Sequence, residues 1–190
     1  MMKNLPKGGP MRPFISLLLA LVTAVTLLLS SCGKAAPPLP ASEILTAMLE
    51  AAETSAQPLP DGVIRLTAVP SDSPSLLTET LFSALYGEAA RGLLSEGEGQ
   101  GPSVQDTALY LSAAPYPCEL GVFRCADGGG AEELASLCRG RLDTLSRGFA
   151  GGEYEEAARG GRVVVEGNWV FLVLCEDPAP LLDVARRMAR

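Results

Sequence analysis

The residues whose chemistry is easiest to recognise are Leu29, Ser30, Ser31 and Cys32, which close a long apolar stretch. This order is typical of a bacterial lipobox, in which small residues admit a signal peptidase and the cysteine thiol forms a thioether to a lipid. We therefore expect residues 1–31 to be a lipoprotein signal peptide and Cys32 to carry a covalent diacylglyceryl group. The pattern indicates a protein of the cell membrane, lipid-anchored on the extracytoplasmic face.

The segment before this cysteine has the composition of a signal peptide. Its charged residues are Lys3, Lys7 and Arg12, and an apolar run of 16 residues follows at 14–29. A membrane-spanning helix normally needs ~20 such residues, so a retained transmembrane anchor is the less favoured alternative. A start at Met11 instead of Met1 leaves a leader of the same kind.

Four further cysteines, Cys118, Cys125, Cys138 and Cys175, have spacings that match no Cys-x-x-Cys redox or zinc motif. Disulfides form readily outside the cell membrane, and four cysteines allow three full pairings. The alternative is that all four thiols are small buried hydrophobic groups, because Cys138 falls on an apolar helix stripe and Cys125 and Cys175 share strand parity with large apolar residues. The sequence leaves both interpretations open.

Missing residue types restrict the chemistry further. The chain contains no histidine, which excludes Ser-His-Asp and Cys-His catalysis and histidine metal sites. Beyond the signal peptide the sole lysine is Lys34, beside the lipid, which excludes a Schiff-base lysine and a Ser-x-x-Lys hydrolase. We therefore predict no metal, no catalytic residue and no cofactor besides the lipid on Cys32.

Acidic side chains are the last candidates for catalysis, since two facing carboxyl groups can hydrolyse a glycan. The candidates are Asp127, Glu132, Glu133, Glu153, Glu155 and Glu156. A solvated acidic helix face is the simpler explanation for them. Arg141 and Tyr154 together could bind an anionic group, with the alternative that they anchor a helix to a sheet. Trp169 is interpreted as a core residue rather than a sugar-stacking platform.

The mature chain is acidic. Removing residues 1–31 takes away three of the 15 basic residues and none of the 22 acidic ones, which leaves a net charge of −10. Such a charge repels phosphate backbones and anionic headgroups. We therefore expect no nucleic acid partner, membrane attachment through the lipid anchor, and an envelope protein or a cell-wall component as partner.

Composition divides the mature chain into a spacer and a domain. Residues 32–41 comprise the lipid-attachment cysteine and a Pro-rich spacer, and residues 42–190 have the length of a single domain. Before residue 105, apolar spacing predicts a helix from Ser42 and another from Pro74, with Ser42 and either Ser73 or Asp72 as N-caps. Residues 63–69 are either a short strand or an extended connection.

The best-defined part of the domain is 105–190, for which we predict an α+β fold. In chain order the main elements are strands at 107–112 and 119–125, a helix at 131–149, strands at 163–165 and 169–175, and a helix after Asp177 and Pro178. A short helical turn at 153–159 precedes the second pair of strands, and a hairpin turn at 166–168 joins them. This strand, strand, helix, strand, strand, helix order predicts an antiparallel sheet on which these helices and the N-terminal ones pack. Both parities of 169–174 are apolar, so both faces of that strand should be covered.

Several of these residues also carry a resemblance. Glu119–Phe123 in the first hairpin, Arg141 in the long helix, Phe149 with Tyr154, and Gly167–Val170 at the second hairpin resemble the uncharacterised bacterial lipoprotein family called domain of unknown function 4358. The likeness extends from about residue 81 to residue 188. It implies a lipid-anchored extracytoplasmic protein and brings no assigned activity. Relatives of this family usually have several lysines and few cysteines, whereas this chain has arginines and five cysteines, so any disulfide pattern is specific to it.

These observations favour a non-enzymatic binding or interaction domain held at the cell envelope. The alternative is a carboxylate-dependent hydrolase acting on cell-wall glycan, which requires two carboxyl groups facing each other across a deep cleft. A thiol-based redox protein is a third hypothesis, and it requires two cysteines exposed in one cleft.

Overall fold

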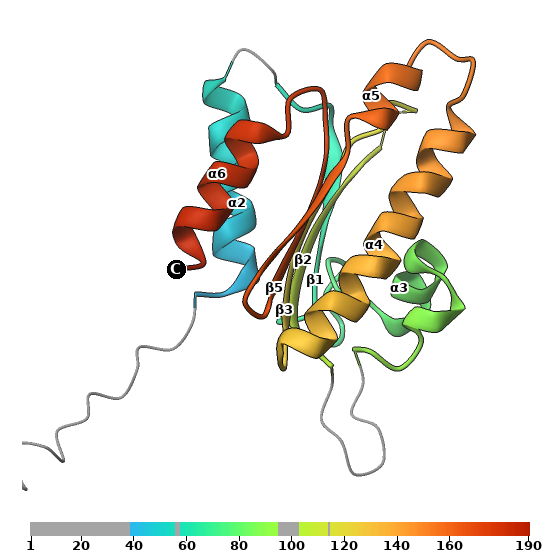
Figure 1. Ribbon diagram of the computed structural model, residues 1–190. Helices are drawn as coiled ribbons and strands as arrows, with labels where there is room; N and C mark the ends of the chain where they lie inside the picture. Colours follow the sequence, from blue (N-terminus) through green and yellow to red (C-terminus); the bar gives the residue numbers. More distant parts are fainter. Residues whose placement is uncertain (1–38, 56–57, 95–102, 114) are drawn as a thin grey trace, which may run out of the picture. The chain divides into compact units, whose positions relative to one another are not determined.

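The computed structural model describes residues 39–55, 58–94, 103–113 and 115–190. The lipobox, Cys32 and most of the Pro-rich spacer lie outside the described residues. Within them, one antiparallel sheet lies between helices that pack on both of its faces (Figure 1). The predicted α+β class is therefore confirmed.

The sheet has five strands in the order β1-β2-β3-β5-β4, and every neighbouring pair is antiparallel. The strands are β1 Gly62–Leu66, β2 Val104–Ser112, β3 Glu119–Cys125, β4 Arg162–Glu166 and β5 Trp169–Leu174. All six residues of β5 are buried, as expected for a strand that is covered on both faces. β3 lies at the centre of the sheet, and β1 and β4 are its edges.

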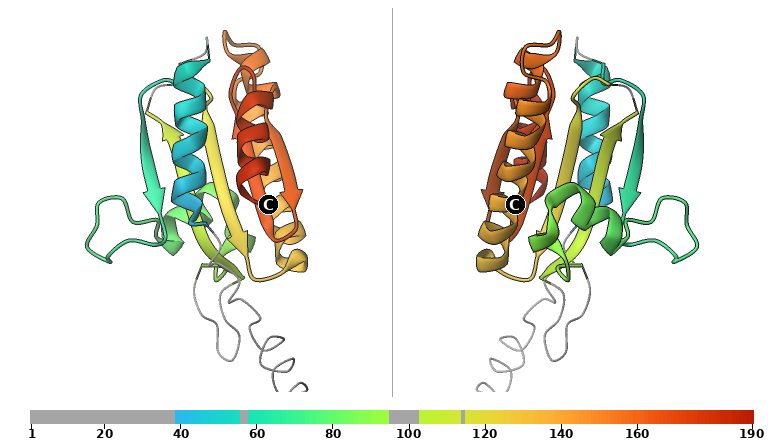
Figure 2. Two further views of the ribbon diagram at one scale, coloured as in Figure 1. Left: turned by 90° about the vertical axis from the view of Figure 1, so that its left-hand side faces the viewer. Right: turned by 90° about the vertical axis from the view of Figure 1, so that its right-hand side faces the viewer.

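The helices form the outer layers. They are α2 Ala41–Thr54, α3 Glu79–Tyr86, the 3-10 helix η1 Glu88–Ala90, α4 Gly128–Gly148, α5 Glu155–Arg159 and α6 Ala179–Met188. Helices α2 and α6 lie side by side on one face, while α3 and α4 cover the other (Figures 1 and 2). In the described part of the chain, no helix combines the length and the apolar character needed to cross a bilayer.

Two apolar clusters, one on each face, hold the layers together. Successive β3 side chains alternate between them, so Leu120 packs towards α2 and α6, whereas Phe123 packs with Phe82 and Leu134 from α3 and α4. Trp169 lies in the first cluster, where its ring is stacked on Phe171. This agrees with the prediction that the tryptophan is a core residue.

The element order differs from the predicted order by two additions. β1 pairs with β2 and makes the uncertain segment at 63–69 an edge strand, although a shorter one. The helical turn at 153–159 contains a distinct five-residue helix, α5. The predicted hairpin at 166–168 is confirmed: Gly167 has φ 64° in its two-residue loop, a conformation that glycine adopts without strain.

Predicted helix starts were less accurate. Helix α2 begins before Ser42, and its first amide, Ala41 N, donates to Asp106 Oδ2 on β2 at 2.8 Å. Helix α3 is capped by Thr78, whose Oγ1 accepts from Leu81 N at 3.2 Å, and not by Ser73 or Asp72. The segment just before α3 instead pairs with the end of β1, where Leu66 N donates to Ser75 O at 2.8 Å. Local spacing cannot reveal such long-range partners.

The long helix also begins earlier than predicted. Asp127 Oδ1 accepts from Gly130 N at 2.8 Å, so α4 begins at Gly128 and not at Ala131. A side-chain oxygen at the N-cap satisfies one of the free amides of the first turn, which offsets the poor helix propensity of three consecutive glycines.

Candidate binding pocket

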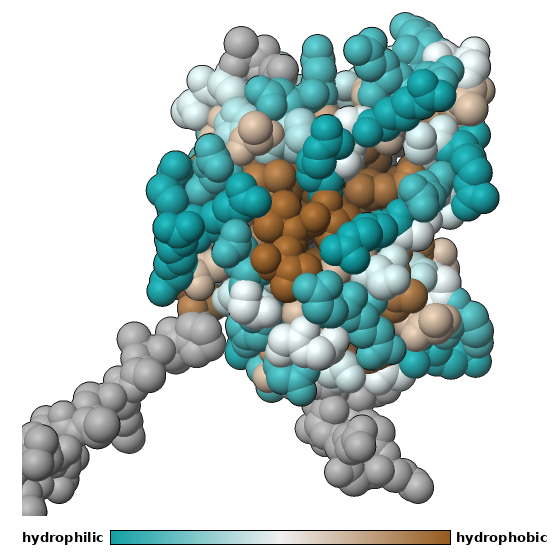
Figure 3. All heavy atoms as spheres, viewed as in Figure 1, coloured by the Kyte–Doolittle hydropathy of each residue, from teal (hydrophilic) through white to brown (hydrophobic). Residues whose placement is uncertain are grey.

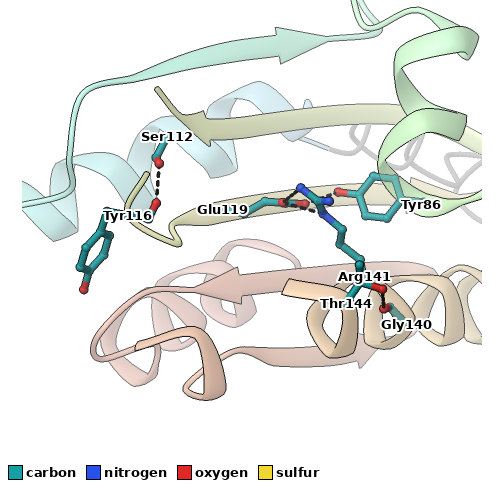
Figure 4. A network of polar contacts seen from close by, with 7 residues as sticks. All are labelled: Tyr86, Ser112, Tyr116, Glu119, Gly140, Arg141 and Thr144. Carbon is teal, nitrogen blue, oxygen red and sulfur yellow. Dashed lines mark hydrogen bonds and ion pairs between the residues drawn. The ribbon is translucent and has the colours of Figure 1, made fainter. Parts of the chain in front are cut away.

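A buried polar network joins α3 and α4 to the central strand. The Glu119 side chain, at the start of β3, is 4% exposed and lies on the face covered by these helices. Arg141 of α4 donates from Nε to Glu119 Oε2 at 3.1 Å, and its Nη2 forms an ion pair with the same oxygen at 3.0 Å. The Tyr86 hydroxyl of α3 donates to Glu119 Oε1 at 2.9 Å (Figure 4). Both carboxylate oxygens therefore accept bonds from neighbouring helices.

Burial and the charges of the network keep the Tyr86 hydroxyl protonated, so that it can donate a hydrogen bond. Burial, followed by the nearby negative charge of Glu119, raises the pKa of Tyr86 well above its ordinary value. The hydroxyl therefore stays protonated, and the carboxylate keeps this donor as well as the guanidinium of Arg141.

Glu119 and Arg141 also form the polar base of a pocket of about 170 Å³. The pocket lies between the β2–β3 turn, the C-terminal half of α4 and the end of β5. Its lining residues are Leu111, Ser112, Pro115, Tyr116, Pro117, Cys118, Glu119, Arg141, Leu145, Phe149 and Leu174. Pockets for drug-sized ligands usually measure ~300–1,000 Å³, whereas a cavity of ~150 Å³ accepts benzene. This pocket therefore has room for one side-chain-sized apolar group.

Aromatic rings build one wall of the pocket. Tyr154 packs edge-on against Tyr116 and Phe149, with ring centroids 5.2 Å and 6.5 Å apart. The Ser112 hydroxyl donates to the Tyr116 carbonyl at 2.7 Å and fixes the turn that carries this ring (Figure 4). Edge-to-face contacts of this kind prefer defined ring orientations, so the wall is preorganised.

The structure gives Arg141 and Tyr154 different partners. Arg141 forms its ion pair with Glu119 and so ties α4 to the sheet, as in the alternative interpretation of this residue. Tyr154 belongs to the aromatic wall and reaches the pocket through the two rings that it supports. Both residues thus contribute to the same pocket, one at its base and one behind its wall.

The acidic candidates fall into two separate groups. Asp127, Glu132 and Glu133 lie at the N-terminal end of α4, and Glu153, Glu155 and Glu156 follow its C-terminal end. A helix of 21 residues at ~1.5 Å per residue is ~30 Å long, so the two groups do not face each other. Within the residues that the structure describes, no cluster of three metal-ligating side chains forms either.

The four described cysteines are free and buried. Cys118 and Cys175 belong to the cluster beneath α2 and α6, and Cys125 and Cys138 to the cluster beneath α3 and α4. Burial raises the pKa of the Cys125 thiol to about 11 and that of Cys138 well above its ordinary value. Such thiols are poor nucleophiles at neutral pH.

A second surface feature lies at the β4 edge of the sheet. Figure 3 shows apolar side chains gathered between the two helical layers on this side of the molecule. Val163, Val164 and Val165 of the edge strand are half-buried there, between Arg162 and Glu166. A large apolar patch that reaches the surface often marks a site of association.

Sequence reasoning missed Glu119 and Tyr86 as site residues, although a signal was present. Glu119 is a charged residue at the start of an otherwise apolar strand, and Arg141 falls between Cys138 and Leu145 on the apolar stripe of the long helix. Opposite charges on two surfaces that are expected to pack together predict a buried ion pair. The tyrosine has no such signal, because its helix could have packed elsewhere.

Comparison with known proteins finds no family model, no curated protein and no solved structure that matches the chain. The resemblance to domain of unknown function 4358 therefore stays a prediction.

Proposed function

We propose that the chain is a bacterial lipoprotein, held by a diacylglyceryl group on Cys32 at the extracytoplasmic face of the membrane, whose domain binds an apolar side chain of an envelope protein. The pocket of about 170 Å³ beside Arg141 carries this proposal, because its size fits one side chain better than a whole metabolite. The lipobox and the resemblance to domain of unknown function 4358 supply the location.

The charge arrangement favours binding over catalysis. Glu119 accepts one hydrogen bond from Tyr86 and one from Arg141, with which it also forms an ion pair, and is thereby held in its place as a structural carboxylate. Arg141, which has five N–H groups, contacts this carboxylate through Nε and Nη2, and its side chain is 20% exposed at the pocket base. The guanidinium can therefore donate to an oxygen atom of a group bound above it.

These features define the chemistry of the partner group. The walls contributed by Leu145, Phe149 and Leu174 are apolar, while the base offers a cationic donor. A tyrosine side chain combines an apolar ring with a hydroxyl that accepts a hydrogen bond. The half-buried apolar side chains of the β4 edge offer further surface for the same partner.

Phenol tests this pocket directly, because it has the size and polarity of a tyrosine ring. In a titration of the full chain followed by amide NMR, phenol should shift the resonances of Cys118, Glu119 and Leu145. Leu145→Trp should abolish these shifts by filling the pocket, whereas Leu137→Trp is the matched control, since Leu137 is a half-buried residue of the same helix outside the pocket.

Two results would count against a protein side chain as the ligand. Equal phenol shifts in the Leu145→Trp variant would show that phenol binds elsewhere. Shifts at the pocket with N-acetylglucosamine but not with phenol would instead assign the pocket to a wall glycan.

A further inference from the structure

The sheet separates the four cysteines into two pairs. Cys118 and Cys175 point to the α2 and α6 side, and Cys125 and Cys138 lie on the α4 side. Of the three full pairings, two require both bonds to cross the sheet. The remaining pairing joins Cys118 to Cys175 on one face of the sheet and Cys125 to Cys138 on the other.

Cys118 and Cys175 lie one residue beyond the ladder of β3 and β5. Leu120 faces Val173, and the last pair is Glu119 with Leu174, so the same register continued by one residue sets Cys118 opposite Cys175. At the other end of the ladder, Cys125 lies opposite Asn168 in the same register, and Cys125 N donates to Asn168 O at 2.8 Å. Hydrogen-bonded and non-hydrogen-bonded pairs alternate along an antiparallel ladder. Because Cys125 belongs to a hydrogen-bonded pair and Cys118 is seven residues before it, Cys118 and Cys175 form a non-hydrogen-bonded pair.

This position suits a disulfide. Opposed residues there have Cα atoms ~4.5 Å apart, inside the ~4.4–6.8 Å range that disulfides span. Cys118 N and O point instead towards β2, where its carbonyl accepts from Ser112 N at 3.1 Å. A bond between the two sulfur atoms therefore leaves the backbone pairing of the sheet unchanged.

Access to reagents also separates the two pairs. Cys118 lines the pocket and is 5% exposed, Cys175 is 4% exposed, and Cys125 and Cys138 are fully buried. Burial, and then the neighbouring Cys175, raises the pKa of Cys118 to about 12, while burial raises that of Cys175 to about 11. Thiolate is therefore scarce at neutral pH, so the uncatalysed oxidation of this pair is slow.

The structure shows both thiols in the free, reduced state. We propose that Cys118 and Cys175 are oxidised to an intramolecular disulfide that joins the start of β3 to the end of β5 at the wall of the pocket. One thiolate attacks the disulfide of an oxidised thiol–disulfide oxidoreductase, and the second displaces it from the mixed disulfide. The two cysteines lose two protons and two electrons, and the oxidoreductase is left with two thiols. In the cell this step rests on the proposed extracytoplasmic location, where such oxidants act.

Peptide mass spectrometry of the full chain tests the pairing. Free thiols are blocked with an alkylating agent at cell lysis, and a second sample of purified, reduced chain is incubated with glutathione disulfide in detergent. We expect a Cys118–Cys175 cross-linked peptide in both samples. Reduction should lower the Tm of the oxidised chain by roughly 5–15 °C.

Variants make the assignment specific. Cys118→Ser and Cys175→Ser should each abolish the cross-link and the effect of reductant on Tm. Cys125→Ala and Cys138→Ala are matched controls on the opposite face and should retain both. A cross-link that forms only with glutathione disulfide supports the pairing and contradicts the extracytoplasmic location. Absence of the cross-link in both samples, or a different pairing, overturns the proposal.

Discussion

At the scale of single residues, the interaction between Glu119 and Arg141 links the fold to the pocket. An ion pair with one partner 4% exposed and the other 20% exposed loses much of its hydration on folding, so its net contribution to stability is small while both partners remain. Removal of one partner leaves the other buried without its counter-charge. The pair is thus more important for fixing the position of α4 on β3 than for total stability.

The variant Arg141→Met tests this role. We expect the free energy of unfolding to fall by about 2–4 kcal/mol, because the Glu119 carboxylate keeps only Tyr86 as a donor. The control Arg147→Met changes an exposed arginine of the same helix and should alter stability by less than ~0.5 kcal/mol. Urea denaturation measures both values. Equal, small effects of the two variants would contradict a buried structural ion pair.

At the scale of elements, the first helix depends on a residue from the middle of the chain. Helix α2 has no side-chain cap of its own, and the buried Asp106 of β2 accepts a hydrogen bond from its first amide. A carboxylate at a helix N-terminus is also favoured by the helix dipole. The helix that follows the spacer is therefore fixed to the sheet at its first residue.

Replacement of Asp106 by alanine should destabilise this attachment. The expected loss is about 1–2 kcal/mol, because Ala41 N is left without its acceptor. Asp143→Ala, at an exposed position of α4, is the control and should have little effect. Hydrogen exchange should show lower protection in α2 than in α4 of the Asp106→Ala variant. Unchanged protection of α2 would show that the cap is dispensable.

Most elements of the sheet and of the long helices could be predicted from the sequence, because period-2 and period-3.6 patterns report burial directly. Both hairpins and α6 illustrate this. Helix starts could not be predicted where a distant residue supplies the cap, as Asp106 does for α2. The pocket was only partly predictable: Arg141 and Tyr154 were candidates, and the position of Glu119 in an apolar strand was a signal, but Tyr86 is identified only when α3 is packed on the sheet.

At the scale of the whole molecule, the proposal joins an anchored N-terminus to a domain with a small apolar pocket. Without the proposed signal peptide the chain has a net charge of −10, which is repelled by anionic lipid headgroups, so the protein surface itself offers little attraction to the membrane. In this proposal, retention at the membrane depends on the acyl chains, at ~0.8 kcal/mol for each buried methylene. The location of the domain, and with it the choice of partner, therefore depends on Cys32.

The most direct test of this account is intact-mass and N-terminal peptide mass spectrometry of the full chain recovered from membranes of a bacterial host. We predict a mature N-terminus at Cys32 that carries a diacylglyceryl group, and a Cys32→Ala variant that leaves the membrane fraction or remains unprocessed. An unmodified mature N-terminus, a retained leader, or a Cys32→Ala variant that behaves like the wild type would contradict the lipid anchor.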